Sequence, residues 1–478
     1  MPPKVPQPAP ARVHPFRAIQ YTAAMRPGGA DISVLIAPPY DVLDAQAKGA
    51  LLAGDERNIA AADLPHIPAK DLGPPEAYRG AAVKLEQWLA EGTMARRERP
   101  AMFCYRQTFD YNGATHRRTG MACAVDLRAL GPAKDGSGGV LPHEQTFSGP
   151  KEDRLALMKA TRTQLSPIFG LHPDEAGRAA GLLARVCDAR PPDVTATTKD
   201  GTRHELWTID DGETIAAYRG MLAGEDIFIA DGHHRYNTSL NYLNALESEA
   251  KARGERVPAD HPARRCMFVL VSMSDEGLVI GPTHRVLGGM ESYSFHAFAQ
   301  RARGELFITP LPHQGEEGLT TIEQAMAKGV KKCGKNVLGL YDFASRCAYL
   351  ATPVDPDPLA FDRRFAGKPR AWRTLDVALC RHLIVEKLCQ PLAGRQGAGK
   401  EPIRWAFPHS IREVIDIGAG LELGSGGGKG FTPQLAVIVL PTPLEAVRAV
   451  SRANELMPQK STFFLPKLAT GLFLNPIG

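Results

Sequence analysis

The stretch Asp231-Gly-His-His-Arg235 concentrates side chains that could hold an anion. Two imidazoles and a guanidinium are hydrogen-bond donors of the kind that bind phosphate. A glycine among them lets the backbone approach a ligand closely. The sequence therefore predicts a phosphate site whose contacts come from Gly232, His233, His234 and Arg235.

The residues on either side of this stretch predict a strand, a tight turn and a helix. Residues 226–230 form a short apolar run typical of a buried strand. Beyond Arg235 the apolar residues fall on one helical face, at Tyr236, Leu240, Leu243 and Leu246. The turn would thus lie at a helix N-terminus, where backbone N–H groups and the helix dipole favour an anion. Asp231 is also a good N-cap, and capping alone is an alternative explanation of that residue.

Three carboxylates are candidates for the chemistry of phosphoryl transfer, which needs positioned charges and a base near the acceptor hydroxyl. Glu144, which lies beside His143 after a loop rich in glycine, is the first choice for the base. Asp41, which follows the rigid Pro38-Pro39 turn, is the second choice. Asp231 is the expected Mg²⁺ ligand, because carboxylates and substrate phosphates together are the usual magnesium arrangement. The alternative for Glu144 is that it caps a helix or forms an ion pair with Lys151 or Arg154.

Cationic side chains elsewhere are candidates for binding substrate anions. Lys151 and Arg154 share one arc of a predicted helix with Leu155 and Met158, which places cations at the rim of a cleft. The alternative is that their long stems reach out to water.

Two further segments are candidates for the same kind of contact. The pair His284-Arg285 follows a strand end and is a second candidate at the anionic site, with a half-buried structural histidine as the alternative. Near the C-terminus, Lys460 and Lys467 lie between prolines, and Ser461 follows the first of them. This segment is expected to contact an anion.

Two resemblances rest on these motifs. Asp-Gly-His-His-Arg-Tyr236 resembles the nucleotide-phosphate motif of the ParB/sulfiredoxin superfamily, whose members include free serine kinases. The whole chain, from His14-Pro-Phe-Arg17 to Met457-Pro-Gln-Lys-Ser-Thr462, resembles an uncharacterised prokaryotic family, domain of unknown function 1015. The first resemblance implies ATP or ADP as a cofactor together with Mg²⁺, and a serine or phosphoserine substrate.

The composition is that of an ordinary globular protein. The chain has 478 residues, of which 44% are hydrophobic and 23% charged, with a net charge of +5. This mild charge, with no basic recognition helix, argues against nucleic acid as a partner. The eight cysteines include no Cys-x-x-Cys pair, which argues against a zinc site and for reduced thiols. With no apolar run of membrane-spanning length, we expect a cytoplasmic protein without a membrane partner.

The order of the predicted elements indicates a multi-domain α+β fold with mixed sheets and a ParB/sulfiredoxin-like phosphate site. Four parts are expected: a disordered lead-in (1–13), an N-terminal α+β domain (14–165), a nucleotide-binding region (166–290) and a C-terminal α/β domain (291–478). The sequence does not indicate an oligomeric state.

These observations favour a nucleotide-dependent, kinase-like phosphotransferase that acts on a small hydroxylated metabolite. One alternative is a non-enzymatic protein of ParB type that binds nucleotide or nucleic acid. Another is a phosphoester hydrolase, in which water replaces the acceptor hydroxyl.

Overall fold

The computed structural model describes residues 12–25, 30–69, 71–144, 149–334, 336–396, 399–400, 403–421 and 432–478. The chain divides into two compact units: unit 1 comprises residues 1–142, 146–279 and 466–478, and unit 2 comprises 143–145 and 280–465. The border expected near 165 lies inside unit 1, and the one expected near 290 lies just after the chain enters unit 2. Most of the expected lead-in, residues 1–11, lies outside the described residues.

A mixed ten-stranded sheet forms the centre of unit 1, in the order β3-β10-β11-β5-β6-β13-β9-β12-β7, with β1 paired to β6. The pairs β3–β10, β9–β13 and β7–β12 are parallel and the others antiparallel. The strands are β1 (Val13–His14), β3 (Ala30–Asp31), β5 (Met102–Tyr111), β6 (Ala114–Asp126), β7 (Val140–Leu141), β9 (Ile168–His172), β10 (Val194–Thr197), β11 (Arg203–Ile209), β12 (Ile227–Asp231) and β13 (Arg265–Ser272).

The tight turn between β5 and β6 shows how local chemistry sets part of this sheet. Asn112 and Gly113 form the turn with φ of 50° and 77°, as their tolerance of positive φ predicts. The register continues without a shift from Tyr111 opposite Ala114 to Phe103 opposite Ala122.

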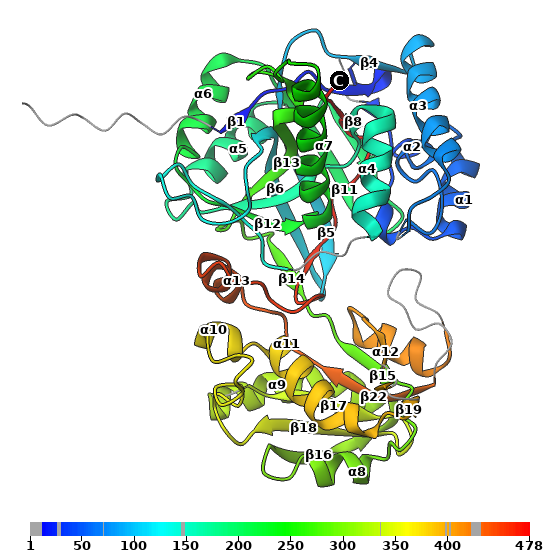
Figure 1. Cartoon of the computed structure of the whole chain (residues 1–478), viewed down its shortest axis with the longest axis vertical. Helices are drawn as coiled ribbons and strands as arrows, with labels where there is room; N and C mark the ends of the chain where they lie inside the picture. The colour runs from blue at the N-terminus through cyan, green and yellow to red at the C-terminus, as the bar shows by residue number, and fades with distance from the viewer. Residues whose placement is uncertain are drawn as a thin grey trace, which may run out of the picture. The chain divides into compact units, whose positions relative to one another are not determined.

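The helices of unit 1 pack on this sheet and on one another (Figure 1). They are α1 (Ala45–Gly54), α2 (Ala60–Asp63), α3 (Pro75–Ala90), α4 (Gly149–Thr161), α5 (Arg178–Ala189), α6 (Gly212–Met221) and α7 (His233–Ala252). The helices α4 and α7 lie side by side, and α3 packs on α4. A hydrophobic core of the unit lies between the sheet and residues of α5, α6 and the start of α7, including Leu183, Tyr218 and Tyr236.

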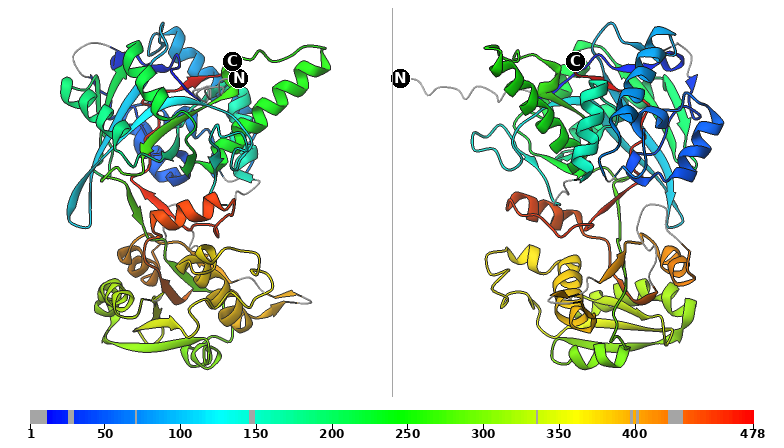
Figure 2. Two further views of the ribbon diagram at one scale, coloured as in Figure 1. Left: turned by 90° about the vertical axis from the view of Figure 1, so that its left-hand side faces the viewer. Right: turned by 45° about the vertical axis from the view of Figure 1, so that its right-hand side comes forward.

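The last residues of the chain complete unit 1 (Figure 2). In this segment β24 (Asn475–Pro476) pairs with β8 (Thr163–Gln164), and Thr470 forms a bridge with Ala37. Its apolar side chains are buried, among them Leu468, Leu472, Phe473, Leu474 and Ile477. A short pair of strands, β2 (Ile19–Tyr21) and β4 (Met94–Arg96), lies beside it, since Ile19 forms a bridge with Leu474.

A six-stranded antiparallel sheet forms the centre of unit 2, in the order β16-β18-β17-β22-β15-β21. The strands are β15 (Arg285–Gly288), β16 (Leu306–Gln314), β17 (Leu338–Asp342), β18 (Cys347–Pro353), β21 (Arg404–Ala406) and β22 (Pro433–Ile438). The helices are α8 (Phe295–Arg301), α9 (Gly315–Cys333), α10 (Arg370–Arg373), α11 (Asp376–Ala378), the π-helix η4 (Leu379–Cys389), α12 (Ile411–Gly418) and α13 (Leu444–Arg452). Helices and several separate sheets occur in both units, which confirms the mixed α and β composition.

Among the helices that the structure describes, none has the length and apolar character needed to cross a membrane.

Candidate functional site

The start of α7 has the strand, turn and helix that the sequence predicts. Strand β12 ends at Asp231, and α7 begins at His233. Between them Gly232 is the N-cap, with φ of 96° and ψ of 25°, and no side chain caps the helix. Because this φ lies in the left-handed region, glycine suits the position. The N-cap explanation of Asp231 is therefore wrong, and its carboxylate has other partners.

Four charged side chains of unit 1 form a chain of ion pairs beside this helix start. The ammonium of Lys467 donates to Asp41 Oδ2 at 2.8 Å and to Asp231 Oδ1 at 3.1 Å. The guanidinium of Arg235 donates to Asp231 Oδ2 at 2.5 Å. Arg235 also donates to the carbonyl of Pro167. Two carboxylates and two cations thus lie in contact at the N-terminus of a long helix.

Different parts of the chain supply these side chains. Asp41 lies in the short helix η2 (Tyr40–Val42), directly after the rigid turn at Pro39. Lys467 lies in the C-terminal segment, whose return to unit 1 places it beside Asp231. The structure thus brings the expected residues Asp41, Asp231 and Arg235 together, and Lys467, from the segment expected to contact an anion, joins Asp41 to Asp231.

The cations keep both carboxylates ionised. Burial alone would raise the pKa of Asp231, but Lys467 and Arg235 outweigh burial and hold that pKa well below its usual range. The pKa of Asp41 is lowered in the same way, with Lys467 as the main opposing influence to burial. Ionised carboxylates accept hydrogen bonds and bind cations, which is the chemistry a magnesium phosphate site needs.

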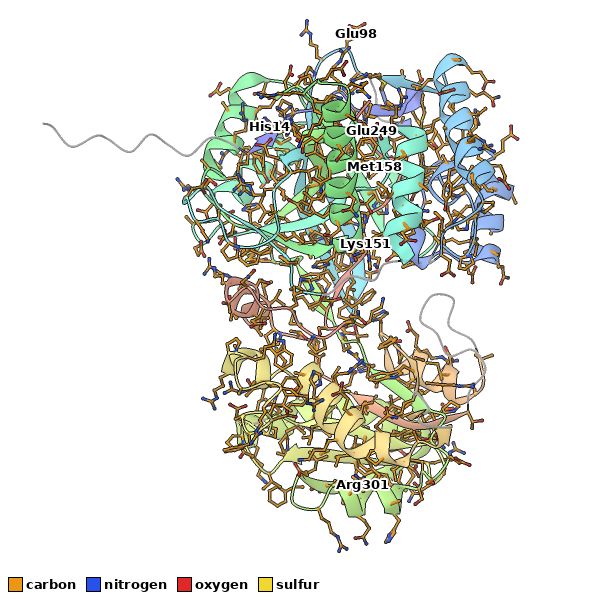
Figure 3. All side chains as sticks on the ribbon, viewed as in Figure 1. His14, Glu98, Lys151, Met158, Glu249 and Arg301 are labelled. Carbon is orange, nitrogen blue, oxygen red and sulfur yellow. The ribbon has the colours of Figure 1, made fainter. Side chains whose placement is uncertain are left out.

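A second group of charges lies directly behind the first. Arg154 on α4 is 5% exposed, so its stem does not reach water, and that alternative is wrong for this residue. Its guanidinium pairs with Asp153 at 2.6 Å and donates to the carbonyl of Asp63 at 2.6 Å. It also lies 4.1 Å from the ring centroid of Tyr40, a cation–π contact. Lys151 is half-buried and lies at the start of α4, well before Met158 (Figure 3).

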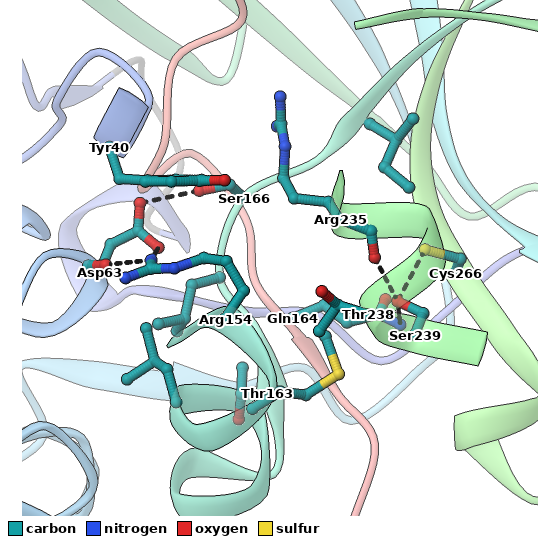
Figure 4. A pocket seen from close by; sticks show the side chains of 14 residues that line it. Tyr40, Asp63, Arg154, Thr163, Gln164, Ser166, Arg235, Thr238, Ser239 and Cys266 are labelled. Atoms are coloured by element: carbon teal, nitrogen blue, oxygen red, sulfur yellow. Dashed lines mark hydrogen bonds and ion pairs between the residues drawn. The ribbon is translucent and has the colours of Figure 1, made fainter. Parts of the chain in front are cut away.

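A cavity of about 40 Å³ joins the two groups (Figure 4). Polar side chains contribute much of its lining: Tyr40, Asp63, Arg154, Ser166, Arg235 and Thr238. Its volume admits about three water molecules, so it extends the polar surroundings of Arg235 inward. Sequence periodicity points to Arg154, but it gives no signal for Tyr40, Asp63 or Thr238, which reach the cavity only through the tertiary fold.

The carboxylate of Glu144, the expected base, stabilises a backbone turn within unit 2. Its Oε1 accepts hydrogen bonds from the N–H groups of Ser461 at 2.9 Å and Thr462 at 3.0 Å. His143 Nε2 shares a hydrogen bond of 2.7 Å with Thr462 Oγ1. Lys460, in the same turn, has a positive φ of 59°. The structure therefore gathers four expected residues, His143, Glu144, Lys460 and Ser461, around one tight turn.

The pair His284-Arg285 also belongs to unit 2. His284 is fully buried, and its Nδ1 accepts a hydrogen bond from the Val439 N–H at 3.3 Å. Burial, followed by the charge of Arg285, lowers the pKa of His284 to about 3, so the imidazole is neutral. Arg285 donates to the carbonyls of Thr283 and Lys460. These contacts favour the structural alternative for His284.

The fit to Mg²⁺ can be judged from the carboxylates of unit 1. Across the described part of the chain, no group of three or more His, Cys, Asp or Glu side chains gathers as a metal site. Asp41 and Asp231 nevertheless contact one cation, the Lys467 ammonium. One or two carboxylates supplemented by substrate phosphates and water are the usual ligands of Mg²⁺, so this pair fits a metal that arrives with a nucleotide.

Comparisons with known proteins identify the family. The model of the family described as "Protein of unknown function (DUF1015)" matches residues 13–378, and the chain belongs to this family. No curated protein matches the chain.

Several solved structures resemble the chain at low similarity. A free serine kinase in complex with AMP is 13% identical, with a TM-score of 0.31 over 73% of this chain and 94% of that one. A free serine kinase variant in complex with ADP is 12% identical, with a TM-score of 0.31 over 72% and 96%. A C-terminally truncated SbnI from Staphylococcus aureus is 10% identical, with a TM-score of 0.29 over 73% and 85%. Similarities at this level assign neither a fold nor an activity to the chain.

Proposed function

We propose that this member of the DUF1015 family is a nucleotide-dependent phosphotransferase that acts on a small hydroxylated metabolite, with serine or phosphoserine as the first substrate to test. The observation that carries the proposal is the ion-paired chain of Asp41, Lys467, Asp231 and Arg235 at the glycine-capped start of α7. The arrangement combines phosphate-binding donors with ionised carboxylates, and phosphoryl transfer uses both.

The phosphates of ATP or ADP bind at the N-terminus of α7 in this proposal. The backbone hydrogen bonds of the helix begin with the one from the Tyr236 N–H to the Gly232 carbonyl, at 3.0 Å. The N–H groups of residues 233–235 therefore lie ahead of the helical ladder, where helices bind anions. Arg235 and Lys467 add cations within the same cluster. His233 and His234 supply further donors at the first turn.

Asp41 is the base in this proposal, in place of Glu144. The Glu144 carboxylate holds the turn at Ser461 and Thr462, whereas Asp41 lies in the charged cluster itself. The lowered pKa of Asp41 suits a carboxylate that orients the acceptor hydroxyl and accepts the hydroxyl proton late in the transfer step. The acceptor oxygen forms the new bond to phosphorus, the bond to the nucleotide oxygen breaks, and the hydroxyl proton passes to the carboxylate.

Asp231 would hold Mg²⁺ when it is present, and the metal would supply charge neutralisation at the phosphates. Lys467 bridges Asp231 and Asp41 and is thus the residue that must move aside or turn toward the phosphates. Lys151 and Arg154 are proposed to support the acceptor side, Arg154 by fixing the position of the Tyr40 ring.

A ³¹P NMR time course on the purified chain with Mg²⁺ tests this function. One sample contains ATP and L-serine, and the other contains ADP and phosphoserine. The proposal predicts a new phosphoserine or nucleotide resonance with wild-type protein, strongly reduced in Asp41→Asn and His234→Ala. Orthophosphate as the sole product would point to a hydrolase. If no resonance changes, serine is excluded as the acceptor, and a wider panel of hydroxylated metabolites decides between transfer and binding alone.

A further inference from the structure

Two cysteines that are far apart in the sequence lie in contact within unit 1. The Sγ atoms of Cys104 and Cys187 are 3.5 Å apart across 83 residues of sequence. Cys104 lies in β5 and is fully buried, whereas Cys187 lies near the end of α5 and is half-buried. A disulfide needs the sulfurs at about 2.05 Å, so a small side-chain movement separates this contact from a covalent bond.

The surroundings give the two sulfurs different chemistry. The hydrogen bond from Cys104, together with the nearby Arg106, lowers the pKa of the Cys187 thiol against the opposing effect of burial. The same hydrogen bond and burial raise the pKa of Cys104 well above its usual value. Cys187 is therefore the partner that ionises first, and the thiolate is the nucleophile in oxidation chemistry.

We propose that Cys187 and Cys104 form an oxidisable dithiol that hydrogen peroxide closes to a disulfide. The Cys187 thiolate attacks one oxygen of the peroxide, so an S–O bond forms, the O–O bond breaks, and the released hydroxide is protonated to water. The Cys104 sulfur then attacks the sulfenic sulfur; an S–S bond forms, the S–O bond breaks, and the departing hydroxide takes the Cys104 proton as water. Two thiols are oxidised, and the peroxide is reduced to two waters.

The other cysteines that the structure describes differ from this pair in burial or in the atoms that their sulfurs contact. Four of them are buried, Cys123, Cys266, Cys380 and Cys389, and burial raises the pKa of each thiol, to about 11 for Cys380, to about 12 for Cys266 and higher still for the other two. Cys347 in β18 is half-buried like Cys187, and its Sγ lies 3.5 Å from the Ser345 carbonyl oxygen. Cys347 is thus a matched control for accessibility. The inference does not depend on the proposed phosphotransferase function.

Peptide mapping by mass spectrometry tests the dithiol directly. The reduced full chain is treated with hydrogen peroxide in the presence of dimedone, alkylated, and digested. We expect a disulfide-linked peptide pair containing residues 104 and 187, which dithiothreitol separates, and the same pair in Cys347→Ser. In Cys104→Ser, whose hydroxyl can still donate a hydrogen bond to Cys187, the oxidation should stop at the sulfenic acid, so the dimedone adduct on Cys187 should rise at least tenfold over wild type.

Two results would overturn the proposal. One is a wild-type chain in which residues 104 and 187 remain unlinked at a peroxide concentration that oxidises Cys347. The other is an equal dimedone adduct on Cys187 in wild type and Cys104→Ser, which would show that Cys104 does not resolve the sulfenic acid. The wild-type mapping needs no variant, so the test does not depend on whether Cys104→Ser folds.

Discussion

Lys467 places one positive charge where two carboxylates approach each other. Its side chain is 18% exposed, against 38% for Asp41 and 27% for Asp231, so all three charges are only partly solvated. The three residues come from distant parts of the sequence, and the Lys467–Asp41 contact spans 426 residues. Charge balance within this cluster therefore depends on one residue of the C-terminal segment.

The variant Lys467→Met should destabilise the folded state by about 1–3 kcal/mol. This is below the 3–5 kcal/mol typical of a broken buried ion pair, because solvent screens the partly exposed Asp41. The double variant Asp41→Asn/Lys467→Met should recover part of the loss, since it removes one uncompensated carboxylate. Urea denaturation measures both. A double variant that is no more stable than Lys467→Met alone would contradict this explanation.

His284 should make the stability of the protein depend on pH. Its pKa is about 3 in the folded state and about 6.5 in an unfolded chain. Between about pH 3 and about pH 6.5 the imidazole binds a proton in the unfolded chain but not in the folded one, which favours unfolding. The contribution of neutral His284 to the free energy of unfolding is therefore complete above about pH 6.5 and is lost as the pH falls toward 3. Between pH 6 and pH 4 the free energy of unfolding should fall about 1.4 kcal/mol per pH unit more steeply in wild type than in His284→Asn.

The asparagine can still accept a hydrogen bond from the Val439 N–H, and the exposed His296→Asn is the control. Denaturation curves at several pH values give the slopes. If His284→Asn keeps the wild-type slope, the buried imidazole is not the source of the effect.

At the scale of elements, Arg154 joins α4 to α2 and to η2. It pairs with Asp153 of its own helix, donates to the Asp63 carbonyl and covers the Tyr40 ring. Asp63 Oδ2 also accepts a hydrogen bond from Ser166 at 2.9 Å. The position of the turn that carries Asp41 thus depends on a buried guanidinium.

Replacing Arg154 with methionine should cost about 3–5 kcal/mol, because it leaves buried carboxylates without their cation. The matched control is Arg412→Met, where the arginine is 75% exposed and pairs with Asp416 one helical turn away; this change should stay within about 0.5 kcal/mol. Chemical denaturation compares the two. Equal losses in both variants would show that burial of the Arg154 pair contributes little.

Local sequence patterns predict individual turns, strands and helices well, but they do not predict which distant segments pair with one another. The turn at Asn112-Gly113 and the strand, turn and helix around Gly232 follow from residues adjacent in sequence. Adjacency in sequence would favour a hairpin of β13 with β14 (Val279–Gly281), which the structure does not form. Strand β14 pairs instead with β23 (Phe463–Leu465), far along the chain. Sequence periodicity shows which face of a strand is buried, but it does not show which strand becomes its neighbour.

At the scale of the whole molecule, the chain leaves unit 1, builds most of unit 2 and returns to unit 1 for its last residues. This path explains why the sequence identifies Asp41 and Asp231 as candidates but does not join them. The composition and spacing near residues 165 and 290, on which the predicted domain borders rest, do not indicate that the last residues of the chain return to unit 1. The residue that completes the charged cluster lies in that segment.

A chain that ends at Leu465 should lose the folded structure of unit 1. The removed segment contributes five large buried apolar side chains, Leu468, Leu472, Phe473, Leu474 and Ile477. At about 1.5–3 kcal/mol each, their burial is comparable to the whole stability of a typical domain. Hydrogen exchange read by mass spectrometry should show lost protection in β5 and β13 and retained protection in β17 and β22. Wild-type protection in β5 would contradict this role of the segment.

The most direct test of the account is a calorimetric titration of Mg²⁺–ADP into wild type, Gly232→Ala and Gly177→Ala. Both glycines are N-caps of helices with left-handed φ, 96° at Gly232 and 63° at Gly177, so a Cβ strains the backbone in both variants. A Cβ at Gly232 would lie 3.0 Å from Arg235 Nε, whereas one at Gly177 meets nothing within 4 Å. We expect at least about tenfold weaker binding in Gly232→Ala and wild-type affinity in Gly177→Ala. Equal affinity in all three proteins, or no binding to wild type, would contradict a nucleotide phosphate site at the start of α7.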